Sequence, residues 1–279
     1  MSAFALTLVL SAAVMHASWN AIVKGASDRA LTLAAVATAH ALVGILLIVL
    51  SEPPAPASWP SLLISTVVHY AYYALMFQAY RIGDLSQVYP ISRGLAPALV
   101  AFGTLLVIGE NLPPLGWAGV AAICCGIGVL ALQRGAVNAD PRAVRLALLL
   151  GLTIAIYSVA DGIGVRWAES PTGYMGWLFL LEAPVVLAVL GRRVAGKHSI
   201  DPRIFAIGLI GGVLSVAAYG VVLYAKTIAP IGAVSAVRES SVIIAALIGV
   251  LMFGERPWRG RVAAAIVVGG GVVLLAASG

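Results

Sequence analysis

The chain has 279 residues, of which 61% are hydrophobic and 10% are charged, and its formal net charge is +6. A soluble domain is nearer half apolar and a quarter charged, so this composition indicates an integral membrane protein without a soluble domain. The sequence holds no phosphate-binding loop, dinucleotide-binding fingerprint or zinc-ligand spacing, and we therefore expect neither enzyme activity nor a cofactor or metal site.

Ten stretches of the sequence are apolar enough, and long enough at about 18 residues or more, to be transmembrane helices. They lack the alternating pattern of barrel strands, so the predicted fold class is all-α. The first stretch continues without a basic leader to Lys24, which predicts a retained span rather than a cleaved signal peptide. In chain order the predicted spans are residues 2–24, 30–51, 58–80, 85–108, 113–132, 142–166, 172–191, 202–226, 231–253 and 259–277.

Most of the 17 lysines and arginines lie in one set of alternate connections, while the opposite set holds Arg166 and Lys226. Cytoplasmic loops of membrane proteins carry the excess of basic residues. We therefore predict that the first set is cytoplasmic and that both termini lie on the non-cytoplasmic side. The first set consists of Lys24, Arg29, Arg81, Arg134, Arg142, Arg145, Arg192, Arg193, Lys197, Arg203, Arg256, Arg259 and Arg261.

The two halves of the chain match when one is shifted by 145 residues. The shift places Arg93 on Arg238 and the hexapeptide LLVIGE of 105–110 on VLMFGE of 250–255. A chance match in a chain rich in Ala, Gly and Leu is the alternative. We predict one repeat of five spans in residues 1–135 and a second in 136–279. Because five is odd, the repeats have opposite orientations, which is typical of alternating-access transporters with a midplane substrate site between the halves.

Three short motifs also resemble a known family. They are HASWNAIVK at 16–24, SQVYPISRGLAP at 86–97, and the Gly-Glu pairs that follow spans 4 and 9 at 109–110 and 254–255. Together with the five-plus-five layout, they resemble the EamA branch of the drug/metabolite transporter (DMT) superfamily over essentially the whole chain. The resemblance implies a secondary transporter, often an exporter of amino acids, metabolites or cationic drugs. It also implies a bundle with a central cavity, built mainly by the first four spans of each half.

Two arginines lie inside predicted spans, where an ionisable side chain is expensive and indicates function. Arg93 is about 12 Å along span 4, between two prolines at 90 and 97 that are expected to bend the helix, and Arg238 is at a similar depth in span 9. A guanidinium is suited to bind a carboxylate, phosphate or phosphonate. The alternative is a structural ion pair with Glu239, Asp84 or carbonyls at a helix end.

Other ionisable groups lie in mid-span. Glu182 is expected to bind a proton or a substrate amine, or else to be a hydrogen-bonded packing residue, and a shift of about 142 places it on His40. His16 and His69 also lie in spans and suit proton coupling, with packing as the alternative.

Polar pairs and tyrosines complete the candidate site. His16 and Asn20 share a helix face beside Trp19, and a shift of 141 places them on Tyr157 and Asp161. Tyrosines in spans 3, 4 and 8 are predicted to line the site and to favour an ammonium group. The predicted substrate-binding residues are therefore Arg93, Glu182, His40, Arg238, His16, Trp19, Asn20, His69, Tyr73, Tyr89, Tyr157, Asp161 and Tyr219.

Spans 5 and 10 are rich in glycine and are assigned to packing or to a homodimer contact, without site residues. The Gly-Glu pairs are expected to define helix ends. Glu110 and Glu255 are therefore interpreted as structural.

The mixed charges of the site favour a zwitterionic substrate. We predict a multi-pass protein of the bacterial inner membrane that transports a small polar metabolite, such as an amino acid or aminophosphonate, by alternating access. The resemblance to the family implies that this protein exports its substrate, with coupling to protons or to the membrane potential. Its expected partners are a small-molecule substrate and membrane lipid, and no nucleic acid. The first alternative is a hydrophobic-cation exporter. Its ligands would be Glu182 and the tyrosines, and its arginines would be structural. A non-transporting membrane scaffold is the second.

Overall fold

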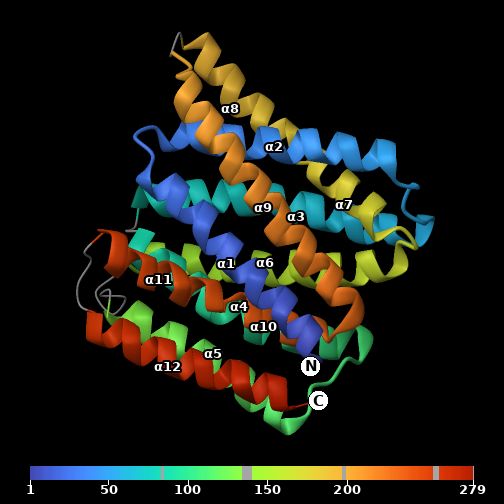
Figure 1. Cartoon of the computed structure of the whole chain (residues 1–279), viewed down its shortest axis with the longest axis vertical. Helices are drawn as coiled ribbons and strands as arrows, with labels where there is room; N and C mark the ends of the chain where they lie inside the picture. Colours follow the sequence, from blue (N-terminus) through green and yellow to red (C-terminus); the bar gives the residue numbers. More distant parts are fainter. Residues whose placement is uncertain (83–84, 134–139, 197–198, 254–257, 279) are drawn as a thin grey trace.

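The computed structural model describes residues 1–82, 85–133, 140–196, 199–253 and 258–278. These residues form helices and connections only (Figure 1). In chain order the helices are α1 (Ala3–Gly25), α2 (Arg29–Leu50), the 3-10 turn η1 (Pro56–Ser58), α3 (Trp59–Ile82), α4 (Leu85–Ile108), α5 (Pro114–Gln133), α6 (Pro141–Trp167), α7 (Pro171–Leu180), α8 (Ala183–Ala195), α9 (Pro202–Ile228), α10 (Ile231–Arg238), α11 (Ser240–Phe253) and α12 (Trp258–Ala277).

Five of these helices begin with a serine or aspartate that caps the N-terminus. The side chains of Ser2, Asp28, Asp140, Ser170 and Asp201 each accept a hydrogen bond from a backbone amide in the first turn of the helix that follows. Proline directly follows the last three caps, where its missing amide costs no helical bond.

Nine helices or helix pairs in the described residues are long and apolar enough to cross a membrane. α3 is the predicted span outside this set, although it has 24 residues, because histidine, glutamine and several tyrosines lower its hydropathy. α3 packs along α6. The ends of the helices agree with the predicted spans to within four residues.

Two predicted spans are interrupted, and both belong to the second half. Span 7 divides into α7 and α8 at Leu181 and Glu182, and Pro184 lies in the first turn of α8, where its missing amide costs no helical bond. Span 9 divides into α10 and α11 at Glu239, where the sequence has no proline. Its counterpart α4 runs as one helix through both Pro90 and Pro97. The prolines therefore do not mark the interruption in this pair of spans.

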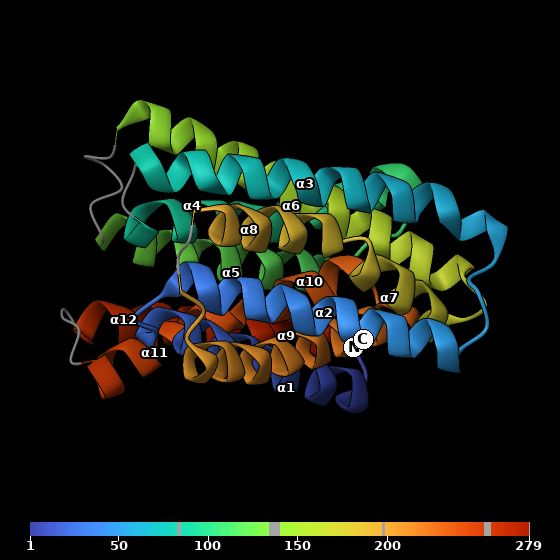
Figure 2. The same cartoon turned by 90° about the horizontal axis from the view of Figure 1, so that it is seen from above.

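The two halves interlock by exchanging neighbours. α1 of the first half packs on α9, α10 and α11, and α6 of the second half packs on the corresponding α3 and α4. Two pairs of equivalent helices pack on each other: α2 on α7 and α8, and α5 on α12 (Figures 1 and 2). This pattern is expected for two inverted repeats related by an approximate twofold axis. The predicted repeat boundary at 135–136 lies outside the described residues.

The α5–α12 contact shows this twofold relation residue by residue. A Cβ placed on Gly119 would lie 2.8 Å from the carbonyl oxygen of Gly271, and one placed on Gly126 would lie 3.1 Å from the carbonyl oxygen of Ala264. The 145-residue shift exchanges the two contacts, placing Gly119 on Ala264 and Gly126 on Gly271. The contact is reciprocal, as in a twofold interface, and the missing side chains let the helix backbones approach closely.

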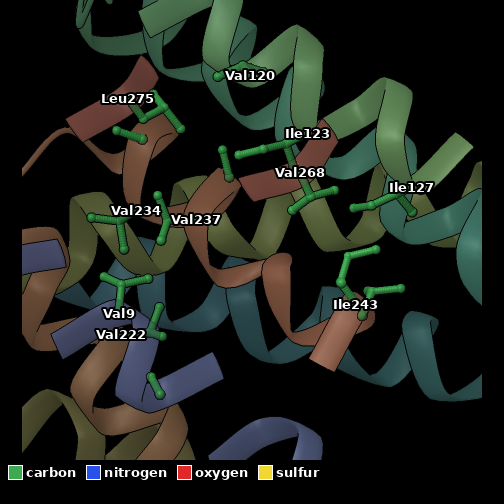
Figure 3. Packing of buried hydrophobic residues seen from close by; sticks show 14 of the residues in the cluster. Val9, Val120, Ile123, Ile127, Val222, Val234, Val237, Ile243, Val268 and Leu275 are labelled. Carbon is green, nitrogen blue, oxygen red and sulfur yellow. The ribbon is translucent and has the colours of Figure 1, made fainter. Parts of the chain in front are cut away.

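Apolar side chains fill the space around these glycines. Figure 3 shows Val120, Ile123 and Ile127 of α5 directed toward Val268 and Leu275 of α12. The glycine-rich spans 5 and 10 therefore pack against each other within the chain.

A substitution at this contact tests the arrangement. We expect Gly271→Ala to lower the melting temperature of the detergent-purified protein, because the new Cβ would lie 2.7 Å from the carbonyl oxygen of Gly119 and 3.0 Å from the amide of Ile123. Overpacking of this kind costs about 1–3 kcal/mol. Gly270→Ala on the same helix is the matched control, since nothing lies within 4 Å of its Cβ. Equal melting temperatures of the two variants would contradict the packing.

Candidate functional site

The buried charges of the two halves meet at the break between α10 and α11. Nη1 of Arg93, from α4, donates to both carboxylate oxygens of Glu239 at 3.0 and 3.3 Å, and Nη2 of Arg238 donates to Oε1 at 3.1 Å. All three residues are at least 94% buried. The repeat-related arginines are therefore joined by one carboxylate, and the ion pair that the sequence left as an alternative is present.

Residues of α1 surround the Arg93 guanidinium. Nη2 of Arg93 lies 3.4 Å from Nε2 of His16, while Nε1 of Trp19 donates to Nδ1 of the same ring at 3.2 Å. Asn20 donates instead to the backbone carbonyl of His16 at 2.7 Å. The Tyr89 ring lies below the guanidinium, 5.4 Å from it. A neutral imidazole has one unprotonated nitrogen, so His16 accepts only one of the two donors that face it.

A second buried contact joins α2 to the break between α7 and α8. Nδ1 of His40 lies 3.0 Å from Oε2 of Glu182, and Nε2 of His40 lies 3.1 Å from Oγ of Ser215 on α9. Tyr73 of α3 lies in the same region, because its ring is 5.6 Å from that of Tyr72, which is 6.1 Å from that of Tyr157. His40 and Glu182 are the two residues that the shift of 142 relates. Equivalent positions of the two repeats therefore meet here as a base and an acid.

Asp161 of α6 forms the third cluster, and it is fully buried. It accepts hydrogen bonds from the hydroxyls of Tyr174 on α7, at 3.0 Å, and Tyr219 on α9. Nζ of Lys226, also fully buried, donates to the carbonyl oxygen of Ser158 at 2.8 Å. Asp161 is thus held by tyrosines, and Lys226 contacts α6 at Ser158, about one helix turn before Asp161.

Aromatic rings connect these clusters. The Tyr219 ring lies 6.0 Å from the Arg238 guanidinium and 6.4 Å from the His69 ring, which stacks on Tyr157 at 4.1 Å. Phe179 lies 6.4 Å from Tyr219 and 5.3 Å from His40. The structure therefore brings all thirteen predicted residues into one connected network inside the bundle. Sequence reasoning did not include Ser215, Tyr174, Phe179 or Lys226 in this network.

One ion pair joins the halves at the end of the bundle where the termini lie. Arg166 donates to Glu110 at 2.8 Å and to the carbonyl oxygens of Lys226 and Ala229 at 2.7 and 2.8 Å. Oε1 of Glu110 accepts from the amide of Ile231, the first residue of α10, at 2.6 Å. Gly109, with φ of 67°, ends α4 just before this contact. Glu110 thus marks a helix end as predicted and also binds the other half, whereas Glu255 lies outside the described residues.

A second ion pair joins the halves at the opposite, basic end. Arg193 at the end of α8 donates to Asp28, the cap of α2, at 2.5 Å. The Arg193 hydrogen bond, with the amide of Leu31, holds the pKa of Asp28 below its usual range. The carboxylate therefore stays charged at neutral pH, and this stabilising contact is lost only as the pH falls through that lowered pKa.

Comparison with known proteins agrees with this architecture. The profile of the EamA-like transporter family matches residues 3–132 and 141–277. Among 29 matching chains of solved structures, one superposes with a TM-score of 0.75 over 98% of this chain and 96% of its own, at 17% sequence identity. It is described only as the crystal structure of a protein, and at this identity the likeness shows the fold alone. No curated protein matches the sequence.

The tyrosines around Asp161 allow a test of the network. We expect Tyr219→Phe to destabilise the purified protein by about 1.5–3 kcal/mol, because it removes one hydrogen bond to a buried carboxylate and keeps the ring. Tyr224→Phe on the same helix is the matched control, since that side chain is 46% exposed. A melting temperature that both substitutions leave unchanged would show that Tyr219 does not support Asp161.

Proposed function

We propose that this chain, which belongs to the EamA-like transporter family, exports a small zwitterionic metabolite across the bacterial inner membrane by alternating access. An amino acid or an aminophosphonate fits the proposed substrate class. Membership of the family indicates a transporter, and the buried network supports the proposal about its substrate.

The observation that carries the proposal is that both signs of charge are buried where the halves meet. Arg93 and Arg238 offer donors for a carboxylate or phosphonate. Glu182 offers an acceptor for an ammonium group and is accompanied by His40. A zwitterion is the class of small molecule that uses both groups, and hydrocarbon gives an unpaired charge no solvation.

Alternating access is supported by the way in which the halves touch. The contacts between them include ion pairs at both ends of the bundle, Glu110–Arg166 and Asp28–Arg193, together with the buried charges between these ends. Ion pairs near a surface are individually weak, so they open at small cost. Rocking of one half against the other would break the contacts at one end while it keeps those at the other.

Proton coupling is proposed to use Glu182 and His40. The two side chains are in contact at 3.0 Å, so a proton that binds to either one changes the charge of the pair. A substrate ammonium group competes with that proton for the same carboxylate. Opposite movement of protons and substrate follows from such competition.

The orientation follows from the basic residues. Arg142 and Arg145 belong to the start of α6, and Arg192 and Arg193 to the end of α8; both helix ends lie away from the termini (Figure 1), and three of the four arginines are exposed. At the termini end, Arg166 is held by Glu110 and Lys226 is fully buried. Exposed arginines of the described residues therefore lie at the end away from the termini, which supports cytoplasmic placement of that end.

A hydrophobic-cation exporter remains the second candidate, and one observation favours it. Glu239 already accepts hydrogen bonds from both Arg93 and Arg238, which leaves Glu182 and the tyrosines as ligands for a cation. The two candidates differ in whether the substrate needs an anionic group.

Binding and flux measurements test the proposal. A thermal-shift screen with amino acids, aminophosphonates, sugars and quaternary amines at pH 6 and pH 8 identifies the ligand class, since a ligand at a hundred times its Kd stabilises by about 2.7 kcal/mol.

In proteoliposomes, we expect Glu182→Gln to abolish the pH dependence of flux and Arg93→Lys to lower flux at least about tenfold, because lysine lacks the planar fork. Arg145→Lys, at an exposed position, is the matched control. Selective binding of quaternary amines, with Arg93→Lys unimpaired, would favour the second candidate.

Cysteine labelling tests the orientation. In a background without Cys124 and Cys125, we expect Ser199→Cys at the basic end to stay unmodified by an impermeant thiol reagent added to intact cells. Ala57→Cys, exposed between α2 and α3 at the termini end, should react. The reverse pattern would invert the proposed topology.

A further inference from the structure

The break between α10 and α11 has features that an ordinary ion pair does not need. The amide of Glu239 donates to the carbonyl of Ala236 at 3.1 Å, and the amide of Val242 donates to the carbonyl of Glu239 at 3.0 Å. These tightened bonds replace the regular helical ones without a proline. The break therefore places Glu239 between two helix segments, directly after Arg238, and starts the N-terminus of α11 at the same point.

The cluster at this break carries more positive than negative charge. In the described residues, Glu239 is the only carboxylate that pairs with the guanidinium groups of Arg93 and Arg238. Their side chains are 3% to 7% exposed, so bulk water does little to screen the remaining charge. One further anionic group would balance the cluster.

The repeats duplicate the arginine and not the carboxylate. The 145-residue shift that places Arg93 on Arg238 places Gly94 on Glu239. Each half therefore contributes a guanidinium to the interface, while the second half alone contributes an acid. If the acid existed only to neutralise a structural arginine, Arg93 would need its own acid as much as Arg238 does.

Some hydrogen-bonding groups next to Arg93 and beside the break in sequence lack a partner. His16 faces two donors, Trp19 and Arg93, and accepts from one of them. Within the described part of the chain, the hydroxyls of Ser235 and Ser240 beside the break are buried and have no partner. A buried polar group without a partner is costly, and a ligand with several acceptor oxygens would satisfy these groups.

We propose that Glu239 occupies the place of the substrate's oxyanion, and that a carboxylate or phosphonate displaces it from between Arg93 and Arg238. This proposal rests on the proposed function and names the binding step of the same site. In the empty carrier Glu239 joins the arginines of the two halves. In the loaded carrier the substrate oxyanion joins them, so substrate binds only by competing with an internal carboxylate.

The decisive variant is Glu239→Gln, which keeps the shape of the side chain and removes the competing charge. The probes are L-alanine, 2-aminoethylphosphonate and L-alaninamide, titrated in thermal-shift assays at constant ionic strength. Acetate, phosphate and sulfate serve as simple oxyanions, with chloride as the reference. We expect Glu239→Gln to bind at least one oxyanion-bearing probe about tenfold or more tightly than the wild-type protein, because each tenfold step needs only about 1.4 kcal/mol. L-alaninamide has an uncharged amide in place of the carboxylate, so Glu239→Gln should not bind it more tightly than the wild-type protein does.

Two further variants control for misfolding and for general charge effects. Glu239→Asp keeps the charge and withdraws it by one methylene, so it should also bind oxyanions more tightly than the wild-type protein. This variant provides the test if Glu239→Gln does not fold. Glu169→Gln removes an exposed carboxylate between α6 and α7 and should leave the affinities unchanged. Adding Arg238→Gln to Glu239→Gln should cancel the gain.

The outcomes separate this proposal from the proposed function. If the wild-type protein transports a zwitterion while both Glu239 variants bind oxyanions no more tightly, the pair is structural and the proposal is wrong, although the function stands. If Glu239→Gln gains arginine-dependent affinity for phosphate or acetate while no zwitterion is transported, the oxyanion site is present and the proposed substrate class is wrong. If neither variant shows any oxyanion-dependent stabilisation, the proposed site does not exist.

Discussion

Hydrocarbon does not solvate charge, and the arrangement of this bundle depends on that constraint. In the described residues, the main ionisable groups inside the bundle are paired: Arg93 and Arg238 share Glu239, Glu182 meets His40, and Asp161 is held by two tyrosines. Two of these contacts, Arg93–Glu239 and His40–Glu182, cross from one repeat to the other. The interface between the repeats is therefore polar at its centre, while glycine and apolar side chains hold the α5–α12 contact at its edge. A polar interface allows the halves to move and still offers alternative partners to a polar ligand.

Hydropathy and internal repetition predicted much of the fold because both can be read along the sequence without knowing which residues are in contact. Apolar runs located the spans, and the Arg93–Arg238 match located the two related halves. The same match gave no sign that α10 and α11 separate at Glu239, because that break has no proline, and the contact of Glu239 with Arg93 joins residues 146 positions apart. Pro90 and Pro97 are a different case, since α4 stays helical through both and no helix end falls at either. Local breakers predict helix ends well only where no tertiary contact overrides them.

The candidate site was predictable as a set of residues and less so as a set of contacts. Buried ionisable groups are rare enough that nearly every one in a span belonged to the network. Which residues would pair could not be read from helix spacing, because the partners lie more than a hundred positions apart. Lys226 shows a further difficulty: near the end of a span it was counted as a loop residue, yet α9 buries it fully beside Ser158. Arg166 was counted in the same way, and its role in binding Glu110 needs the turn between α9 and α10 to come close.

The departures from repeat symmetry bear on how the carrier would change state. Two identical inverted repeats would give inward-open and outward-open forms of equal energy, because exchanging the conformations of the halves converts one form into the other. Glu239 opposite Gly94, and a broken span opposite a continuous one, remove that equality in the empty protein. A substrate oxyanion held equally by Arg93 and Arg238 would restore much of it, since the arginines are the part of the site that the repeats share. A ligand shifts such an equilibrium only through its different affinity for the two forms. Displacement of an acid that belongs to one half supplies that difference.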